Sequence, residues 1–90
     1  MEEELVKGIA LITRSKNRKK ILNYLKNGII TPSEISKGTN IDNSHVSKYL
    51  KSMKEANLIV CLNEEDTQGR LHRITKLGKK VLNCMQNKKT

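Results

Sequence analysis

Two helix-start signals stand close together near the middle of this chain. Thr31-Pro32-Ser33-Glu34 combines a Thr N-cap, a Pro at the first helical position and a Glu that closes a capping box. Gly38-Thr39-Asn40 ends the short helix that follows, about residues 32–37, and Asp42 or Asn43 can cap a second helix reaching about residue 56. The sequence therefore predicts two short helices joined by a tight turn, the helix-turn-helix pattern.

The segments before this pair predict two further helices. Residues 2–13 place Leu5, Ile9 and Ile12 on one stripe, and acids stand at the start of this segment, where a helix prefers negative charge. Ser15 can cap the next helix, which Gly28 ends.

The segments after the pair predict a hairpin and a last helix. Residues 58–62 are β-prone and too short for a helix, residues 63–69 form a polar loop, and residues 70–75 return as a second strand. Thr75 can cap a last helix that carries an apolar face at helical spacing: Leu77, Val81, Cys84 and Met85.

These elements predict an α+β fold that is mostly helical. It is a winged helix-turn-helix with a two-stranded β-hairpin as the wing and additional N- and C-terminal helices. Ninety residues make one domain around one small core. We expect residues 1–13 to form the N-terminal helix, residues 14–76 the helix-turn-helix with its wing, and residues 77–90 the C-terminal helix.

The charge of the chain favours a polyanionic partner. Lys and Arg number 18 against nine Asp and Glu, a net charge of +9. Lysine-rich faces also keep small proteins in solution, but here two acid-free basic runs flank the helix-turn-helix. The first run is Arg14, Lys16, Arg18, Lys19, Lys20 and Lys26, and the second is Arg70, Arg73, Lys76, Lys79, Lys80, Lys88 and Lys89.

The second helix of the pair has the pattern of a recognition helix. At about 100° per residue, Val46, Leu50 and Met53 form a buried arc. The opposite side carries short hydroxyls and long cations that suit a DNA major groove: Ser44, Ser47, Lys48 and Lys51.

Four more side chains are candidates for the same DNA surface. Asn43 could pair with adenine or only cap the helix, and His45 could contact DNA or be an ordinary exposed histidine. The start of the preceding helix adds the hydroxyls of Thr31 and Ser33.

The predicted wing has an acidic loop and a basic second strand. Glu64, Glu65 and Asp66 are poor partners for phosphate, so we expect the acidic side to point away from DNA. Arg70 and Arg73 would then reach the DNA backbone or an adjacent minor groove.

One run of the chain contains, in this order, Thr31-Pro32-Ser33-Glu34-Ile35, His45-Val46-Ser47-Lys48-Tyr49-Leu50-Lys51 and Glu55-Ala56-Asn57-Leu58-Ile59. This run resembles winged-helix transcriptional regulators of the ArsR and MarR type, above all small archaeal members. Gly69-Arg70, His72-Arg73-Ile74-Thr75 and Gly78 resemble the end of their wing and the next helix. The resemblance, over roughly residues 16–82, implies a dimeric regulator of an inverted repeat.

The chain departs from that pattern at two points. Asn57 stands where these families usually have glycine, a substitution that left-handed backbone tolerates. The thiol-rich motif of the metal-sensing members is missing, so we do not expect metal sensing by that route. We also expect no metal site and no cofactor elsewhere in the chain.

The register of the hairpin determines whether a different metal site is possible. If Asn63 pairs with Arg70, Cys61 faces His72 and Cys84 might add a third ligand. If the register slips by one residue, Val60 faces His72 instead. We favour the slipped register, because it gathers Leu58, Val60 and Leu62 on one face, and we expect packed cysteines.

The terminal helices suggest a homodimer. Their apolar residues could cover the domain's own core or pair with a second copy, and we favour pairing. The expected dimer residues are Leu5, Ile9, Ile12, Val81 and Met85. Two recognition helices about 34 Å apart would then match successive turns of an inverted repeat.

The cellular location is inferred from what the sequence lacks. No apolar stretch is long enough for a membrane span, and the acidic start lacks the basic residues of a signal peptide. Two cysteines without CxxC spacing fit a reducing compartment. We therefore expect a cytoplasmic protein with no membrane partner.

The sequence thus predicts a sequence-specific regulator that binds double-stranded DNA. Two alternatives remain open: a winged-helix module that binds another protein, and a nucleoid-type architectural DNA-binding protein. Catalysis is not expected, because no nucleophile has a nearby base and no phosphate-binding glycine loop is present.

Overall fold

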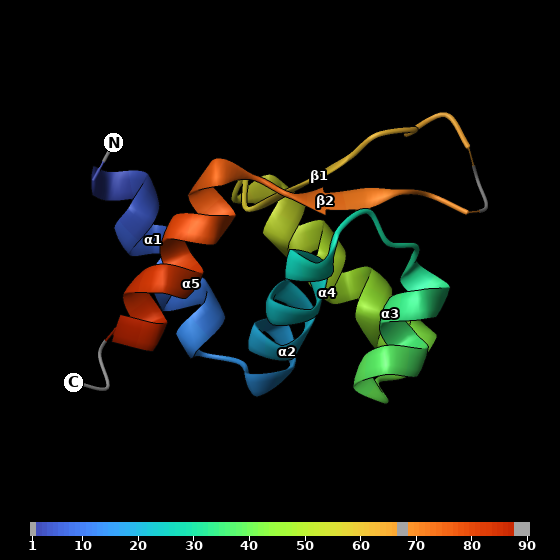
Figure 1. Ribbon diagram of the computed structural model, residues 1–90, viewed down its shortest axis with the longest axis horizontal. Coiled ribbons are helices and arrows are strands. Elements are labelled where there is room, and N and C mark those ends of the chain that lie inside the picture. The colour runs from blue at the N-terminus through green and yellow to red at the C-terminus, as the bar shows by residue number, and fades with distance from the viewer. Residues whose placement is uncertain (1, 67–68, 88–90) are drawn as a thin grey trace.

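The computed structural model describes residues 2–66 and 69–87 (Figure 1). Within them the elements are α1 (Glu2–Thr13), α2 (Lys16–Tyr24), a 3-10 turn η1 (Leu25–Asn27), α3 (Pro32–Thr39), α4 (Asn43–Glu55), β1 (Ile59–Cys61), β2 (His72–Ile74) and α5 (Lys76–Asn87). The predicted order and the mostly helical winged-helix fold are confirmed. None of the helices described is long and apolar enough to span a bilayer.

The helix-turn-helix forms at the start signal that the sequence contains. Thr31 Oγ1 accepts a hydrogen bond from the Glu34 amide at 3.3 Å, and the Glu34 carboxylate accepts one from the Thr31 amide at 2.9 Å. The bond from the Thr31 amide, together with one from the Thr31 hydroxyl to the same carboxylate oxygen at 3.1 Å, lowers the pKa of Glu34. The helix ends at Asn40, whose φ of 63° reverses the chain. Local chemistry therefore accounts for both ends of α3.

The core lies between the helices and beneath the sheet. The predicted inner stripe of α4 is confirmed, because Val46, Leu50 and Met53 are all buried. They join a single cluster that also contains Ile12, Ile21, Leu22, Leu25, Ile30, Ile35, Ile41, Leu58, Ile59, Ile74, Val81 and Leu82.

The hairpin register differs from the one we favoured. Cys61 faces His72, Val60 faces Arg73 and Ile59 faces Ile74. The slipped register is therefore wrong.

The reason lies in the turn before β1. Asn57 has a φ of 64°, and the Leu58 amide still bonds to the Met53 carbonyl at 3.0 Å. Leu58 is buried by this turn and not by the strand's alternation. Its burial therefore does not predict which side Val60 and Leu62 face, and both are exposed.

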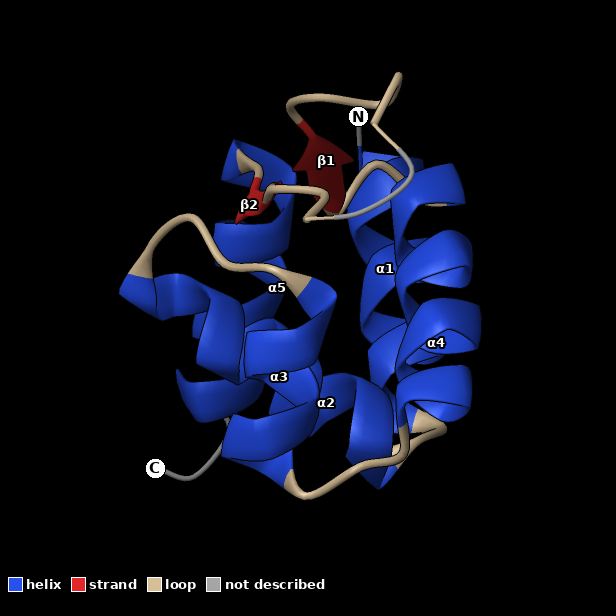
Figure 2. Cartoon of the chain, turned by 90° about the vertical axis from the view of Figure 1, so that its right-hand side faces the viewer, coloured by secondary structure: helices blue, strands red, loops and turns tan. Residues whose placement is uncertain are grey.

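A third segment completes the sheet region. The Ile30 amide donates to the His72 carbonyl and the His72 amide donates to the Ile30 carbonyl, both at 3.0 Å. The second strand therefore lies between β1 and the chain that enters α3. The hairpin projects beyond the helical body (Figure 2).

Helix α5 is held against the base of the hairpin. Thr75 Oγ1 accepts from the Gly78 amide at 3.1 Å and donates to the Asn57 carbonyl at 2.7 Å. A Cβ at Gly78 would lie 2.3 Å from the Leu58 carbonyl oxygen, so only glycine permits this approach. The helix then packs along α1, at the end of the molecule far from the wing loop (Figure 1).

Candidate nucleic-acid interface

The outer face of α4 carries the predicted recognition residues. All six predicted side chains on this helix are exposed: Asn43, Ser44, His45, Ser47, Lys48 and Lys51. Asp42 lies beside His45, with 3.9 Å between the His45 ring Nδ1 and a carboxylate oxygen. The helix thus presents a continuous polar surface on the side opposite its buried stripe.

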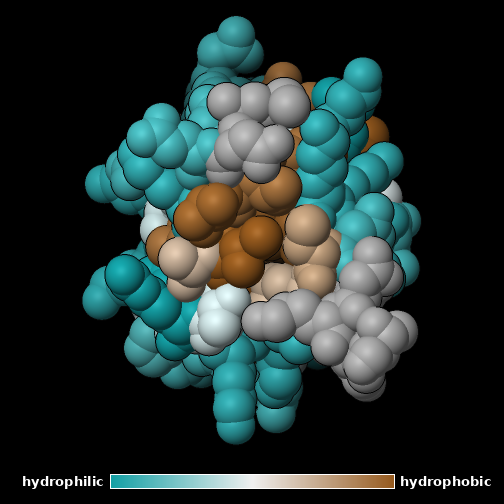
Figure 3. All heavy atoms as spheres, turned by 90° about the vertical axis from the view of Figure 1, so that its left-hand side faces the viewer, coloured by the Kyte–Doolittle hydropathy of each residue, from teal (hydrophilic) through white to brown (hydrophobic). Residues whose placement is uncertain are grey.

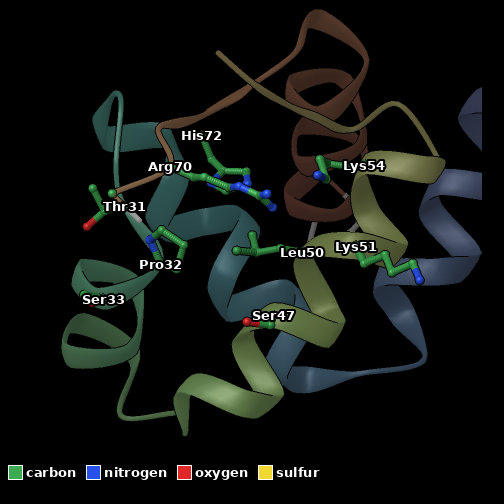
Figure 4. Close-up of a pocket in the computed structure, with 10 residues that line it drawn as sticks. Thr31, Pro32, Ser33, Ser47, Leu50, Lys51, Lys54, Arg70 and His72 are labelled. Carbon is green, nitrogen blue, oxygen red and sulfur yellow. The ribbon is translucent and has the colours of Figure 1, made fainter. Parts of the chain in front are cut away.

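A groove lies between this helix, the start of α3 and the wing, and we call it the wing groove (Figure 4). Arg70 and His72 extend into it from the wing. Its lining residues are Thr31, Pro32, Ser33, Ser47, Leu50, Lys51, Lys54, Gly69, Arg70 and His72.

The wing groove brings together five of the ten predicted DNA-binding residues, and the other five, Asn43, Ser44, His45, Lys48 and Arg73, lie outside it. Hydroxyls of Thr31, Ser33 and Ser47 line it with the cations of Lys51 and Arg70. By contrast, Arg73 is exposed on the other face of the hairpin, because side chains alternate along β2 between inside and outside. The two wing arginines therefore serve different surfaces.

Lys54 is a groove residue that we did not predict. Its spacing from Ser47 and Lys51 puts it on the same flank of α4, which is the signal that could have identified it. Its Nζ lies 3.1 Å from Glu64 Oε2 in the wing loop, and this bond lowers the pKa of Glu64. The loop therefore turns its first acid, Glu64, towards α4.

Asn63 forms hydrogen bonds to both sides of the wing loop. Asn63 Oδ1 accepts from the Leu71 amide at 2.7 Å, and Asn63 Nδ2 donates to an Asp66 carboxylate oxygen at 2.8 Å. Arg70 Nε donates to the Asp66 carbonyl at 2.6 Å, which restrains the arginine. Arg70 is thus held at the groove before any partner arrives.

His72 is buried where the wing meets the groove. Its side chain is 3% exposed, and its Nδ1 has no hydrogen-bond partner among the described residues. Burial lowers the pKa of His72, and the nearby positive charge of Lys54 adds to this effect. The neutral ring is therefore the stable form in the folded protein at neutral pH.

The cysteines do not join His72 in a recognisable metal site. Cys61 faces His72 across the sheet and is buried, whereas Cys84 lies on α5, and both thiols are free. In the part of the chain described, no three His, Cys, Asp or Glu side chains are grouped to hold a metal ion.

The predicted dimer residues divide into two groups. Ile12 and Val81 are fully buried in the core of the single chain, so they cannot meet a second copy, and their assignment was wrong. Leu5, Ile9 and Met85 are half-buried around that core. Figure 3 shows apolar side chains gathered at this end of the molecule within a polar rim.

A family model described as winged helix-turn-helix matches residues 13–90. The chain belongs to this family. No curated protein sequence matches the chain. The predicted resemblance is therefore confirmed at the level of the fold.

Solved structures of transcriptional regulators share this winged helix-turn-helix fold. A MarR family transcription regulator superposes with a TM-score of 0.77 at 16% identity, over 94% of this chain and 58% of its own. A possible transcriptional regulator for arsenical resistance gives 0.71 at 18% identity, over 90% and 81%. The MepR–DNA complex of S. aureus gives 0.74 at 19% identity, over 97% and 73%. This winged-helix chain therefore spans little more than half of the first of these proteins.

Proposed function

We propose that this winged-helix protein is a sequence-specific transcriptional regulator that binds double-stranded DNA. The observation that carries the proposal is the wing groove, which Lys51, Lys54 and Arg70 line beside the exposed face of α4. A net charge of +9 supports binding to a polyanion. The fold is also that of MepR, which has been solved as a DNA complex.

In this proposal α4 enters the major groove. Its polar face carries the base-reading side chains, with short hydroxyls close to base edges and lysines able to reach guanine acceptors or phosphates. The residues concerned are Asn43, Ser44, His45, Ser47, Lys48 and Lys51.

The flanking elements would hold the DNA backbone. Thr31 and Ser33 stand at the start of α3, where backbone amides and the helix dipole favour a phosphate. Arg70 reaches the backbone or minor groove from the wing groove, and Arg73 contacts phosphate from the outer face of the hairpin.

A homodimer on an inverted repeat is the assembly that we propose. The half-buried Leu5, Ile9 and Met85 would pair with a second copy, together with Val6, which is 62% exposed. Sedimentation at micromolar concentration should show the dimer, and a monomer alone would contradict it.

Selection of bound fragments from random duplex tests the function directly. An enriched inverted repeat is the expected result. Retention of all sequences equally would instead indicate an architectural protein, and no retention at moderate salt would indicate a protein-binding module. Either of these two outcomes would overturn the proposal.

The wing contact is tested by a matched pair of variants. R70A should weaken binding to the selected duplex about tenfold, since charge-assisted contacts typically contribute about 1.5–3 kcal/mol. R73A removes the same charge from the outer face and should cost less. Unchanged affinity in R70A would show that the wing groove is not the contact surface.

A further inference from the structure

Arg18 belongs to the first basic run of the sequence, yet its side chain is already engaged within the protein. It lies in the first turn of α2, where its amide donates to the N-cap Ser15 at 3.2 Å. Its Nη1 donates to the Leu11 carbonyl in the last turn of α1 at 3.3 Å. Its Nε donates to Ser52 Oγ on α4 at 3.2 Å. One half-buried guanidinium therefore bridges three helices.

The α4 end of this bridge is built from mutually supporting contacts. The Arg18 guanidinium carbon lies 5.5 Å from the centroid of the Tyr49 ring, a distance that permits a cation–π interaction. The Ser52 hydroxyl donates to the Tyr49 carbonyl at 2.8 Å, and Asn17 Nδ2 donates to the Tyr49 hydroxyl at 3.2 Å. Among the side chains described, no carboxylate forms an ion pair with Arg18.

The bridge holds the flank of α4 that faces away from the wing groove. At about 100° per residue, Tyr49 and Ser52 lie on one side of the buried Val46, and Ser47 and Lys54 lie on the other. A rotation of α4 about its axis would therefore break the bridge and displace the recognition side chains together.

We propose that Arg18 is a positioning residue of the recognition helix. It ties the last turn of α1 to Tyr49 and Ser52 and so sets the orientation in which α4 meets the bases. This inference rests on the DNA-binding function proposed above. If it holds, Arg18 contributes to the preference for one DNA sequence over another. A contact with phosphate would instead raise the affinity for all DNA sequences alike.

The planar fork of arginine makes the proposal testable with R18K. Lysine keeps the charge but cannot reproduce two donors at fixed angles or the same stacking on a ring. S52A removes one partner from the other side of the bridge. R18Q removes the charge as well, and K19Q is its matched control, because Lys19 is exposed on the same helix.

Fluorescence anisotropy should be measured on the selected duplex and on a scrambled duplex, over a range of salt concentrations. Circular dichroism would verify that each variant is folded at the temperature used. We expect R18K to lower the preference for the selected duplex about tenfold, with the salt slope unchanged. S52A should act in the same direction and add little to R18K, since both break one bridge. K19Q should leave the preference unchanged.

Three outcomes would overturn the proposal. One is an R18K protein that retains the wild-type preference. Another is an equal loss on both duplexes, which indicates a structural role only. A third is wild-type affinity in R18K combined with a salt slope about 0.9 lower in R18Q, the signature of one phosphate contact. If the wild type itself shows no preference, the DNA-regulator function fails and this inference fails with it.

Discussion

On its α2 flank the recognition helix is held by half-buried groups, whereas on its wing flank it is held by an ion pair whose carboxylate is exposed. The α2 flank combines hydrogen bonds and a cation–π contact around Arg18, Tyr49 and Ser52. The wing flank depends on the Lys54–Glu64 pair, in which the Glu64 side chain is 57% exposed. Salt screens exposed pairs much more than buried contacts.

The difference suggests a division of roles between the two flanks. In the proposed function, the α2 flank would set the orientation of α4, and the wing flank would exchange its internal partner for DNA. Lys54 would leave Glu64 for a phosphate at little cost, because the ion pair that it gives up is weak.

The largest expected effect is on the α2 flank. Tyr49→Ala should lower the free energy of unfolding by about 2 kcal/mol, because it removes half-buried ring contacts together with the cation–π interaction. Urea unfolding followed by circular dichroism measures this. Tyr49→Phe is the control and should lose about 1 kcal/mol or less, the contribution of one hydrogen bond to Asn17. A Tyr49→Ala variant as stable as wild type would break the comparison.

A smaller effect is expected in the wing loop. Asn63→Ala removes the acceptor of the Leu71 amide and the donor to Asp66, at a cost of about 1 kcal/mol. Hydrogen exchange at the Leu71 amide should accelerate while exchange in α2 stays unchanged. Acceleration in both regions would show that the two flanks are not independent.

His72 makes the wing flank sensitive to pH. Its folded pKa lies below the ordinary value of about 6.5, so the unfolded chain binds its proton first as the pH falls. Stability should be fully present above about pH 6.5 and should decline below it, by at most about 1.4 kcal/mol per pH unit.

The measurement compares denaturant unfolding of wild type and His72→Gln between pH 5 and pH 7. Lys54, Arg70 and Glu64 are the charged groups around the ring, and both proteins contain them. His45 is also common to both, so the difference between the two curves isolates His72. Parallel curves would mean that His72 takes up its proton equally in the folded and unfolded states.

The smallest stability change is expected at Glu64. Glu64→Gln should leave the free energy of unfolding nearly unchanged, since the Glu64 carboxylate is exposed to solvent. The same substitution should strengthen binding to DNA, because a freed Lys54 can contact a phosphate. The salt slope of the affinity should then steepen by up to about 0.9. Anisotropy titrations at several salt concentrations measure this. Weaker binding would show that Glu64 orders the groove and does not compete with DNA.

The helix boundaries and the polar face of α4 could be predicted because their causes are local. The capping box at Thr31 and Glu34 needs only neighbouring residues, and the buried Val46, Leu50 and Met53 follow from helical spacing. The hairpin register could not be predicted in the same way. It depends on Leu58, whose burial comes from the turn at Asn57 and not from strand alternation.

The roles of individual charges were also beyond local reasoning. In the sequence, Arg18 is one member of a basic run. Only the structure shows that its guanidinium is hydrogen-bonded to Leu11 and Ser52 within the protein. Ile12 and Val81 looked like dimer contacts until the packing of α1 against α5 buried them.

The sequence by itself determined which segments become helices, which face of α4 is polar, and that the chain carries a winged helix-turn-helix. Helix caps, apolar periodicity and charge depend on residues within one or two helical turns, so they can be recognised in a short stretch of sequence. Only the tertiary structure decided the register, the partner of Lys54 and the bridge at Arg18. Each of these joins residues distant in the chain, and such pairs are selected by packing and by the directions of hydrogen bonds.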